Sequence, residues 1–263
     1  MVDGTILVFG HRPSGSSRAL LKAAADRGIG AVQLTGPEPP ADLIGCGAHL
    51  YSGLLLADAL ASALGITLLE AAPGWLADLP EPLRGRDIVL VPIAEAYGLH
   101  RPVFVKSPND KRVRAGLYAD GAHLPGPDAV DPETLVLVAD PVSFAAEFRL
   151  HVLDGAVHAG SQYASNGSLA LAPLDGHPHH GAVLGFAREV LAACAATLPS
   201  AIVVDVGLTV DAQGTERWAV VEANGAWGSG CYAADPQRAL DVVLRASGTA
   251  ETLSRHDLRF ART

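Results

Sequence analysis

The chain has 263 residues, of which 49% are apolar, so it is long enough to bury a substantial core as one large domain or two small ones. Its formal net charge is -9, with 19 Lys and Arg against 28 Asp and Glu. This balance excludes a general electrostatic attraction to nucleic acid or to an anionic membrane, but it leaves room for a local basic site. The three cysteines, Cys46, Cys194 and Cys231, are far apart and form no CxxC pair, so the sequence predicts neither a disulfide framework nor a structural zinc site.

The first residues indicate a protein of the cytoplasm. The segment MVDGTILVFGHRP is acidic, and its apolar run is shorter than that of a secretory signal. The longest dense apolar stretch, residues 49–72, is interrupted by Asp58, Ser62 and Gly65 at helical spacing. This spacing is typical of a core helix that leads into a strand, so we expect no membrane segment.

The first third of the chain predicts a βαβ unit. Residues 5–10 are a short apolar strand, residues 14–30 have serine caps, a helical apolar stripe and a glycine stop, and residues 31–36 predict a second strand. No GxGxxG motif follows the first strand, which argues against a dinucleotide site. The proline-rich residues 73–87 indicate a connecting segment or a domain boundary.

Strands dominate the remainder of the chain, with one amphipathic helix at residues 181–198 between them. The predicted strands lie at residues 88–92, 102–107, 116–120, 134–140, 146–155, 156–164, 201–211 and 217–224. A small α/β front followed by an α+β body with largely antiparallel sheets is the expected architecture.

A concentration of positive charge follows the strand at residues 102–107. Lys106 ends that strand, and a Pro-Asn-Asp turn then leads to Lys111, Arg112 and Arg114. Cations on a strand end and on a turn are suited to bind a polyphosphate. A solvated basic loop after an edge strand would explain Arg112 and Arg114 equally well, but it explains Lys106 poorly.

The strand at residues 146–155 carries two charges on one face. Alternation places Glu147 and Arg149 on one side and Phe148 and Leu150 on the other. The Arg149 guanidinium suits a phosphate or a carboxylate, and Glu147 is able to accept from a ribose hydroxyl. Cross-strand ion pairing is the alternative for both. The strand before it, at residues 134–140, is expected to offer edge backbone groups to an adenine base.

The last two strands predict a set of oxygen ligands. Asp205 lies among Val and Ile residues, so its carboxylate needs a cation, an arginine or backbone donors as a partner. A hairpin through residues 211–214 would bring it beside Glu222 and Asn224, which share one face of the final strand. Such a set suits Mg²⁺ that also binds phosphate, whereas the alternative is a plain turn at Asn224 and Gly225.

This order of motifs resembles the ATP-grasp superfamily, in particular a small bacterial and phage branch with extra Arg and Lys positions, and the resemblance covers residues 102–244. It implies an α+β and α/β ATP-grasp fold with largely antiparallel sheets. Residues 1–100 would form a small N-terminal pre-ATP-grasp-like α/β lobe, and residues 101–263 the nucleotide-binding and catalytic region. The chain departs from the family in two ways: no acidic residue directly follows the hinge strand, and no second nucleotide-binding lysine is apparent.

The resemblance also implies roles for single positions. Lys106, together with Lys111 and Arg112 of the covering loop at residues 107–116, would hold nucleotide phosphate, and Glu147 would contact the nucleotide. The adenine-binding hinge would be formed by Leu137, Val138 and Ala139. Arg149 would contact the reacting oxygen atoms, and the Mg²⁺ ligands would be Asp205, Glu222 and Asn224.

The substrate end of the site is less defined. The glycine-rich loop that follows Asn224 would border the acceptor pocket, with Trp227 as a wall and Gly228, Ser229 and Gly230 as backbone donors. Weaker candidates are Tyr163 and, near the N-terminus, His11 and Arg12.

Two further motifs are open to a functional and a plain interpretation. The cluster HPHH at residues 177–180 lies in a loop without a helix to fix a metal-binding pair, which favours an exposed loop over a metal site. Cys231 lies beside the glycine-rich loop, but no adjacent His or Asp supports it as a nucleophile.

The resemblance implies an ATP- and Mg²⁺-dependent ligase that joins a carboxylate to an amine through an acyl phosphate, on a small molecule or a peptide. The alternative is a nucleotide-binding regulatory module or a degenerate subunit without ligase activity, and a third interpretation is a hydrolase-like enzyme that uses Cys231. No nucleic-acid or membrane partner is expected, and a homodimer is possible.

Overall fold

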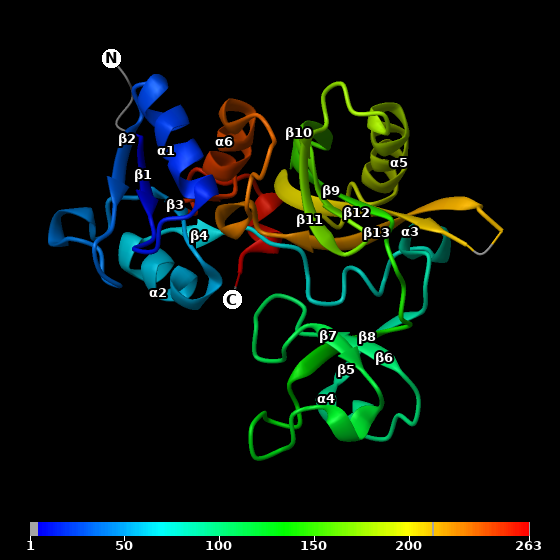
Figure 1. Cartoon of the computed structure of the whole chain (residues 1–263). Helices are drawn as coiled ribbons and strands as arrows, with labels where there is room; N and C mark the ends of the chain where they lie inside the picture. Colours follow the sequence, from blue (N-terminus) through cyan, green and yellow to red (C-terminus); the bar gives the residue numbers. More distant parts are fainter. Residues whose placement is uncertain (1–4, 212, 263) are drawn as a thin grey trace.

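The computed structural model describes residues 5–211 and 213–262 (Figure 1). The fold is mixed α/β with mostly antiparallel sheets, as the sequence predicts. A parallel three-stranded sheet lies at the N-terminal end, a five-stranded antiparallel sheet forms the centre, and a four-stranded antiparallel sheet is set apart below it (Figure 1). No helix of these residues is long and apolar enough to cross a membrane.

The N-terminal region contains the predicted βαβ unit. Its elements are β1 (Ile6–Phe9), α1 (Gly15–Asp26), β2 (Gly30–Gln33), η1 (Ala41–Leu43), β3 (His49–Tyr51), α2 (Leu54–Leu64) and β4 (Thr67–Leu68). The strands β2, β1 and β3 pair in that order and are all parallel. The side chain of Ser14 accepts from the Ser17 backbone in a capping box, and Gly65 ends α2 with a left-handed φ of 69°.

The four-stranded sheet includes a strand that the expected boundary at residue 100 had assigned to the N-terminal lobe. The elements here are α3 (Glu81–Arg84), β5 (Ile88–Pro92), α4 (Ile93–Ala96), β6 (Val103–Lys106), β7 (Gly116–Tyr118), η2 (Gly121–His123) and β8 (Leu135–Ala139). Strand β5 pairs with β8 and so lies in the same sheet as β6 and β7. The strand pairing therefore moves the break in the chain to before β5, because backbone pairing outweighs the local proline signal.

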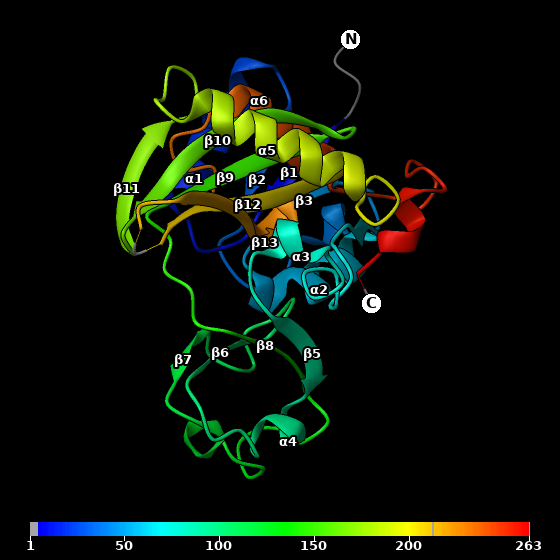
Figure 2. The same ribbon diagram turned by 90° about the vertical axis from the view of Figure 1, so that its right-hand side faces the viewer.

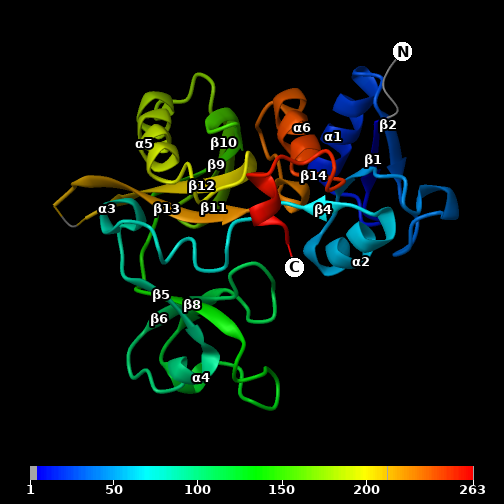
Figure 3. The same ribbon diagram turned by 180° about the vertical axis from the view of Figure 1, so that it is seen from behind.

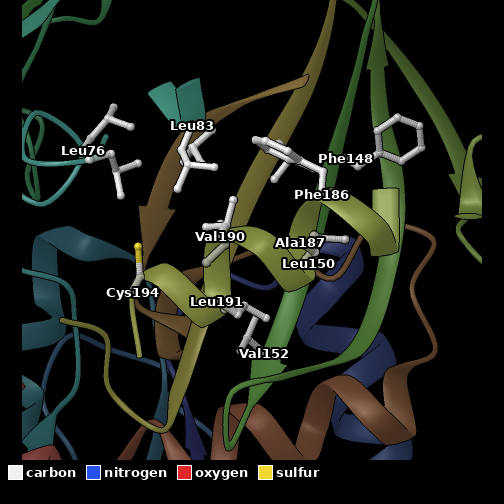
Figure 4. Packing of buried hydrophobic residues seen from close by; sticks show 14 of the residues in the cluster. Leu76, Leu83, Phe148, Leu150, Val152, Phe186, Ala187, Val190, Leu191 and Cys194 are labelled. Atoms are coloured by element: carbon white, nitrogen blue, oxygen red, sulfur yellow. The ribbon is translucent and has the colours of Figure 1, made fainter. Parts of the chain in front are cut away.

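The five-stranded sheet is antiparallel throughout and runs in the order β11-β10-β9-β12-β13. Its elements are β9 (Ala146–Leu153), β10 (Ala156–Ser165), β11 (Ser168–Pro173), α5 (His180–Ala193), β12 (Ala201–Val210) and β13 (Glu216–Asn224). Helix α5 lies across one face (Figure 2). Phe148 and Leu150 point toward Phe186 and Val190 of this helix in the main core, as alternation along β9 predicts (Figure 4).

The end of the chain returns to the N-terminal region. Its elements are η3 (Ala226–Gly228), α6 (Pro236–Arg245), β14 (Ser247–Gly248) and η4 (Asp257–Phe260). Helix α6 packs on α1, β14 pairs with β4, and the last segment lies beside β4 and α2 (Figure 3). Apolar residues of α6, β1, β3 and β12 share one buried cluster, which ties the first and last parts of the chain together.

Candidate active site

A cleft of about 1300 Å³ lies between the four-stranded and the five-stranded sheets. One wall is formed by β6, β8 and the loop at residues 107–115, and the other by β9, β10 and the end of β13. The linker at residues 140–145 joins the two walls. Twelve residues with expected roles line it, namely Lys106, Lys111, Leu137, Ala139, Glu147, Arg149, Tyr163, Glu222, Asn224, Trp227, Gly228 and Ser229.

The cations of the first wall have different surroundings. Lys106, the last residue of β6, is partly buried and forms an ion pair with Glu222 across the cleft. In the loop that follows, the buried Ser107 hydroxyl accepts from the Val113 amide at 2.9 Å, which fixes the turn. Lys111 lines the cleft, whereas Arg112 pairs with Asp110 outside it. The structure therefore brings Lys106 and Lys111 to the cleft and does not bring Arg112 there.

The buried carboxylate of Asp205 has an arginine as its partner. Asp205 in β12 lies directly opposite Arg149 in β9, and Arg149 donates to both carboxylate oxygens, from Nε at 2.9 Å and from Nη2 at 2.6 Å. Complete burial raises the pKa of Asp205 to about 6, against the opposing effect of Arg149, so the carboxylate remains ionised at neutral pH. Of the three partners that the sequence leaves open, the structure shows the arginine.

The predicted hairpin brings Glu222 beside Asp205. Strands β12 and β13 pair with Asp205 opposite Glu222, and a bulge follows at Val206. Asn224 donates to Glu222 Oε1 at 2.7 Å, and Arg149 Nη2 lies 3.7 Å from the same oxygen. Burial favours a raised pKa for Glu222, but Lys106 and the Asn224 amide outweigh it and lower the pKa to about 2. The carboxylate is therefore ionised and held by donors on both sides.

The side chains of Asp205, Glu222 and Asn224 fit a magnesium ion only if substrate completes its ligand shell. Among the described residues, no three His, Cys, Asp or Glu side chains are grouped so that they could hold a metal ion. Two carboxylates and one amide oxygen are hard ligands, and Mg²⁺ usually takes its other ligands from phosphate and water. This donor chemistry suits a cation that arrives with a phosphate-bearing substrate.

Two tyrosines enclose the Arg149 guanidinium. The rings of Tyr163 and Tyr232 stack with centroids 5.4 Å apart, and the guanidinium carbon of Arg149 lies 5.5 Å and 5.1 Å from their respective centroids. The Tyr163 hydroxyl donates to Glu147 at 2.7 Å, so the carboxylate proposed for a ribose contact already has a partner. Sequence reasoning missed Tyr232, because only its left-handed φ of 47° and its tertiary neighbours distinguish it.

The hinge strand is interior, which corrects the expectation of a free edge at residues 134–140. The backbone of β8 pairs with β5 on one side and with β6 on the other, and Ala139 has a partner in each. Leu137 and Ala139 line the cleft, whereas Val138 points into the opposite core with Val103 and Val105. The unpaired backbone next to the cleft therefore begins in the linker after Ala139.

Arg86 is a second residue that sequence reasoning missed. It lines the cleft, donates to the backbone carbonyls of Val220 and Val221 at 2.9 Å and 3.3 Å, and lies over the Phe144 ring at 5.6 Å. No carboxylate of the described residues lies within ion-pair distance of it, and burial lowers its pKa to about 10. Nothing in the local pattern around Arg86 distinguishes it from a loop arginine.

The expected acceptor end is partly present. Trp227 is buried and its indole donates to the Leu69 carbonyl at 2.9 Å, so it fixes the glycine-rich loop to the N-terminal region. Gly228 and Ser229 line the cleft beside it. Three of the residues expected at this end are not part of the cleft lining, namely His11, Arg12 and Gly230.

The two remaining motifs contribute no chemistry to the cleft. His177 and His179 stack at 5.6 Å and pack against Phe148, and α5 begins at His180, so the histidines close the end of the main core. Cys231 is buried, and burial raises the pKa of its thiol, which is the opposite of what a nucleophile needs.

Comparison with known proteins places these features in a family. The model of the ATP-grasp domain, R(2)K clade family 2, matches residues 83–242. The structure of D-cycloserine synthetase DcsG is similar at a TM-score of 0.53 and 14% identity, covering 91% of this chain and 98% of that one. The RimK domain ATP-grasp protein of Sphaerobacter thermophilus gives 0.45 and 18%, covering 91% and 99%. No curated protein matches the sequence.

Proposed function

Because this chain belongs to family 2 of the R(2)K clade of ATP-grasp domains, we propose that it is an ATP- and Mg²⁺-dependent ligase that joins a carboxylate to an amine. One observation carries the proposal. Lys106, Arg149, Asp205 and Glu222 come from four strands of two different sheets and meet at one cleft. Strands of unrelated sequence position rarely converge four charges in a partly buried space unless the charges act on a ligand.

The cleft has an apolar and a charged end, which suits the two ends of a nucleotide. Ile88, Phe104, Leu137 and Ala139 line the apolar end, where a purine ring would lie. Lys106 and the loop at residues 107–115 line the charged end, where the phosphates would lie. Arg86, whose guanidinium has no carboxylate partner among the described residues, adds a positive charge to this wall.

The proposed Mg²⁺ ligands are Asp205, Glu222 and Asn224. When bound, the ion would neutralise charge on the phosphate oxygens during transfer of the γ-phosphoryl group. Lys106 would hold the phosphates from the opposite wall.

The proposed reaction has two steps. A substrate carboxylate oxygen attacks the γ-phosphorus, the bond from that phosphorus to ADP breaks, and an acyl phosphate forms. An amine nitrogen then attacks the acyl carbon, phosphate leaves, and the nitrogen loses a proton. Arg149 has its Nε and Nη2 committed to Asp205, so its Nη1 remains to orient the carboxylate or the phosphoryl oxygens.

A thermal melt tests the nucleotide and metal assignments together. At about 100 times Kd, ATP with Mg²⁺ should stabilise the wild type by about 2.7 kcal/mol, and ATP with a chelator by much less. Glu222→Gln keeps the size of the side chain and removes its charge, so this variant should lose most of the Mg²⁺-dependent rise while its ligand-free form stays folded. An equal Mg²⁺-dependent rise in both proteins would exclude Glu222 as a ligand.

A screen for ADP release separates the ligase from a nucleotide-binding module without activity. Pairs of carboxylates and amines would be added to ATP, Mg²⁺ and the protein, and products identified by mass spectrometry. ADP release that needs both a carboxylate and an amine supports the ligase. Nucleotide binding without turnover on any pair supports the regulatory alternative.

A further inference from the structure

Both carboxylates of the proposed metal site are already bound by cations of the protein. Glu222 is paired with Lys106 and receives the Asn224 amide, and Asp205 is paired with Arg149 through two hydrogen bonds. The cluster thus contains two negative and two positive side chains and is close to neutral. Its members are poorly exposed, from none for Asp205 to 28% for the Glu222 side chain.

A neutral, partly buried cluster is a poor site for a free divalent cation. Adding Mg²⁺ alone would bring two uncompensated positive charges beside Lys106 and Arg149, and these repel it at short range in a medium of low polarity. The ion would also have to displace Lys106 from Glu222, which leaves the ammonium without its carboxylate. Neither cost is offset by a ligand that brings no negative charge.

The complex of Mg²⁺ with ATP changes this balance. Its phosphates carry more negative charge than the ion is able to neutralise, so an ammonium released from Glu222 finds a phosphate oxygen in exchange. On this basis, which rests on the proposed function, we propose that Lys106 is a built-in counter-ion that occupies the metal's side of Glu222 until Mg²⁺ arrives together with a nucleotide. The site then takes the metal–nucleotide complex in preference to the free metal.

The two cations differ in their freedom to move. Arg149 is buried, bound through two hydrogen bonds, and enclosed by Tyr163 and Tyr232, so its position is determined by several contacts. Lys106 has a single carboxylate partner, at the end of a strand, on a flexible four-carbon stem. The exchange is therefore assigned to Lys106 and Glu222, while Arg149 and Asp205 keep their pairing.

Binding of Mn²⁺ alone tests the exchange, because the prediction for one substitution has opposite signs for two ligands. Lys106→Met is close in length and uncharged, so without nucleotide it should bind Mn²⁺ about ten- to hundredfold tighter than the wild type, which is the range expected when a charge-assisted competitor is removed. The same variant should bind ATP with Mg²⁺ more weakly. Free Mn²⁺ is measured by its paramagnetic resonance signal, and ATP binding by calorimetry.

Lys111→Met is the matched control, because Lys111 lines the same cleft and has no carboxylate partner among the described residues. It removes the same charge and should change Mn²⁺ affinity by less than about threefold, since exposed charges are well screened. An unchanged Mn²⁺ affinity in Lys106→Met, or an equal rise in Lys111→Met, would overturn the inference.

A second variant keeps the inference testable if Lys106→Met folds poorly. Glu222→Gln releases Lys106, so in the presence of a chelator it should bind ATP tighter than the wild type by about tenfold. Glu147→Gln removes a carboxylate from the same cleft that pairs with Tyr163 and not with Lys106, and it should give a smaller gain. Equal gains in both variants would overturn the exchange.

The outcomes also separate this inference from the proposed function. A folded wild type that binds no ATP with Mg²⁺ would overturn the proposed function and the inference with it. A wild type that binds ATP with Mg²⁺, together with an unchanged Mn²⁺ affinity in Lys106→Met, would overturn the inference alone.

Discussion

Asp205 and Arg149 show how single residues depend on neighbouring strands. A carboxylate among Val and Ile residues is costly unless donors satisfy it, and Arg149 supplies two of them from the adjacent strand. The sequence predicts the need for a partner at Asp205. The register of β9 and β12 decides which residue meets that need.

His151 lies two residues after Arg149 on the same face of β9, and it predicts a pH dependence. The side chain is fully buried, and neither ring nitrogen has a hydrogen-bond partner among the described residues. Burial, assisted by Arg149 and His158, lowers the pKa of His151 to about 3. The folded protein therefore binds the proton less readily than the unfolded chain, whose histidine pKa is about 6.5.

Stability should accordingly fall as the pH falls below about 6.5, by up to about 1.4 kcal/mol for each pH unit down to the folded pKa. His151→Leu removes this contribution, so the wild type should lose about 2 kcal/mol more than the variant between pH 7 and pH 5. Urea unfolding at the two pH values measures the difference. His100→Gln, which removes an exposed imidazole, is the control and should behave like the wild type. Equal losses in the wild type and His151→Leu would contradict the assignment.

At the scale of elements, the linker between the two sheets is positioned by β12. Gly207 has no side chain, and the Phe144 ring of the linker packs directly on its backbone. Arg86 lies over the other part of this contact and holds the β13 carbonyls. The back of the cleft thus depends on one glycine in a buried strand.

Gly207→Ala should therefore displace the linker. A β-carbon at this position would overlap the Phe144 ring, and overpacking of this kind costs about 1–3 kcal/mol. We expect a lower midpoint in urea and weaker nucleotide binding. Gly185→Ala in α5 is the matched control, because a β-carbon there meets no atom within 4 Å and should stabilise the helix by up to about 1 kcal/mol. A neutral effect of Gly207→Ala would show that the ring moves away without cost.

At the scale of the whole molecule, Arg262 joins three parts of the chain. It pairs with Asp58 of α2 at 2.6 Å and with Glu70 at 2.7 Å, and it donates to the carbonyl of Asn109 at 3.1 Å. Its guanidinium also lies over the Trp227 ring at 5.5 Å. Asn109 belongs to the loop that we expect to cover the phosphates, so this loop is held by the N-terminal and C-terminal regions together.

Arg262→Met should loosen that loop. Removal of the guanidinium leaves Glu70 partly buried without its cation, so we expect a loss of about 1–3 kcal/mol in stability. Amide hydrogen exchange should rise at residues 107–115 and remain unchanged in β9 and β12. Arg259→Met is the control, because Arg259 is exposed and its hydrogen bonds go only to His256. Unchanged exchange in the loop would mean that its own turn holds it in place.

The sequence by itself determined the local structure and the family. Alternation in residues 146–155, the caps of α1 and the hairpin before Glu222 each follow from neighbouring residues, and all three are present. The motif order from Lys106 to Asn224 identified the ATP-grasp superfamily, which the family model confirms. The carboxylates and the lysine were found in the sequence because charged residues are unusual at the ends of apolar strands.

Only the tertiary structure decided which side chains meet. Arg86 and Tyr232 look like ordinary loop residues in the sequence, and Arg262 lies 153 positions from the loop residue that it holds. The interior place of β8 and the pairing of Lys106 with Glu222 likewise depend on contacts between distant segments. Local patterns report which face of an element is buried, whereas partners across a cleft depend on sheet order, strand register and the packing of whole elements.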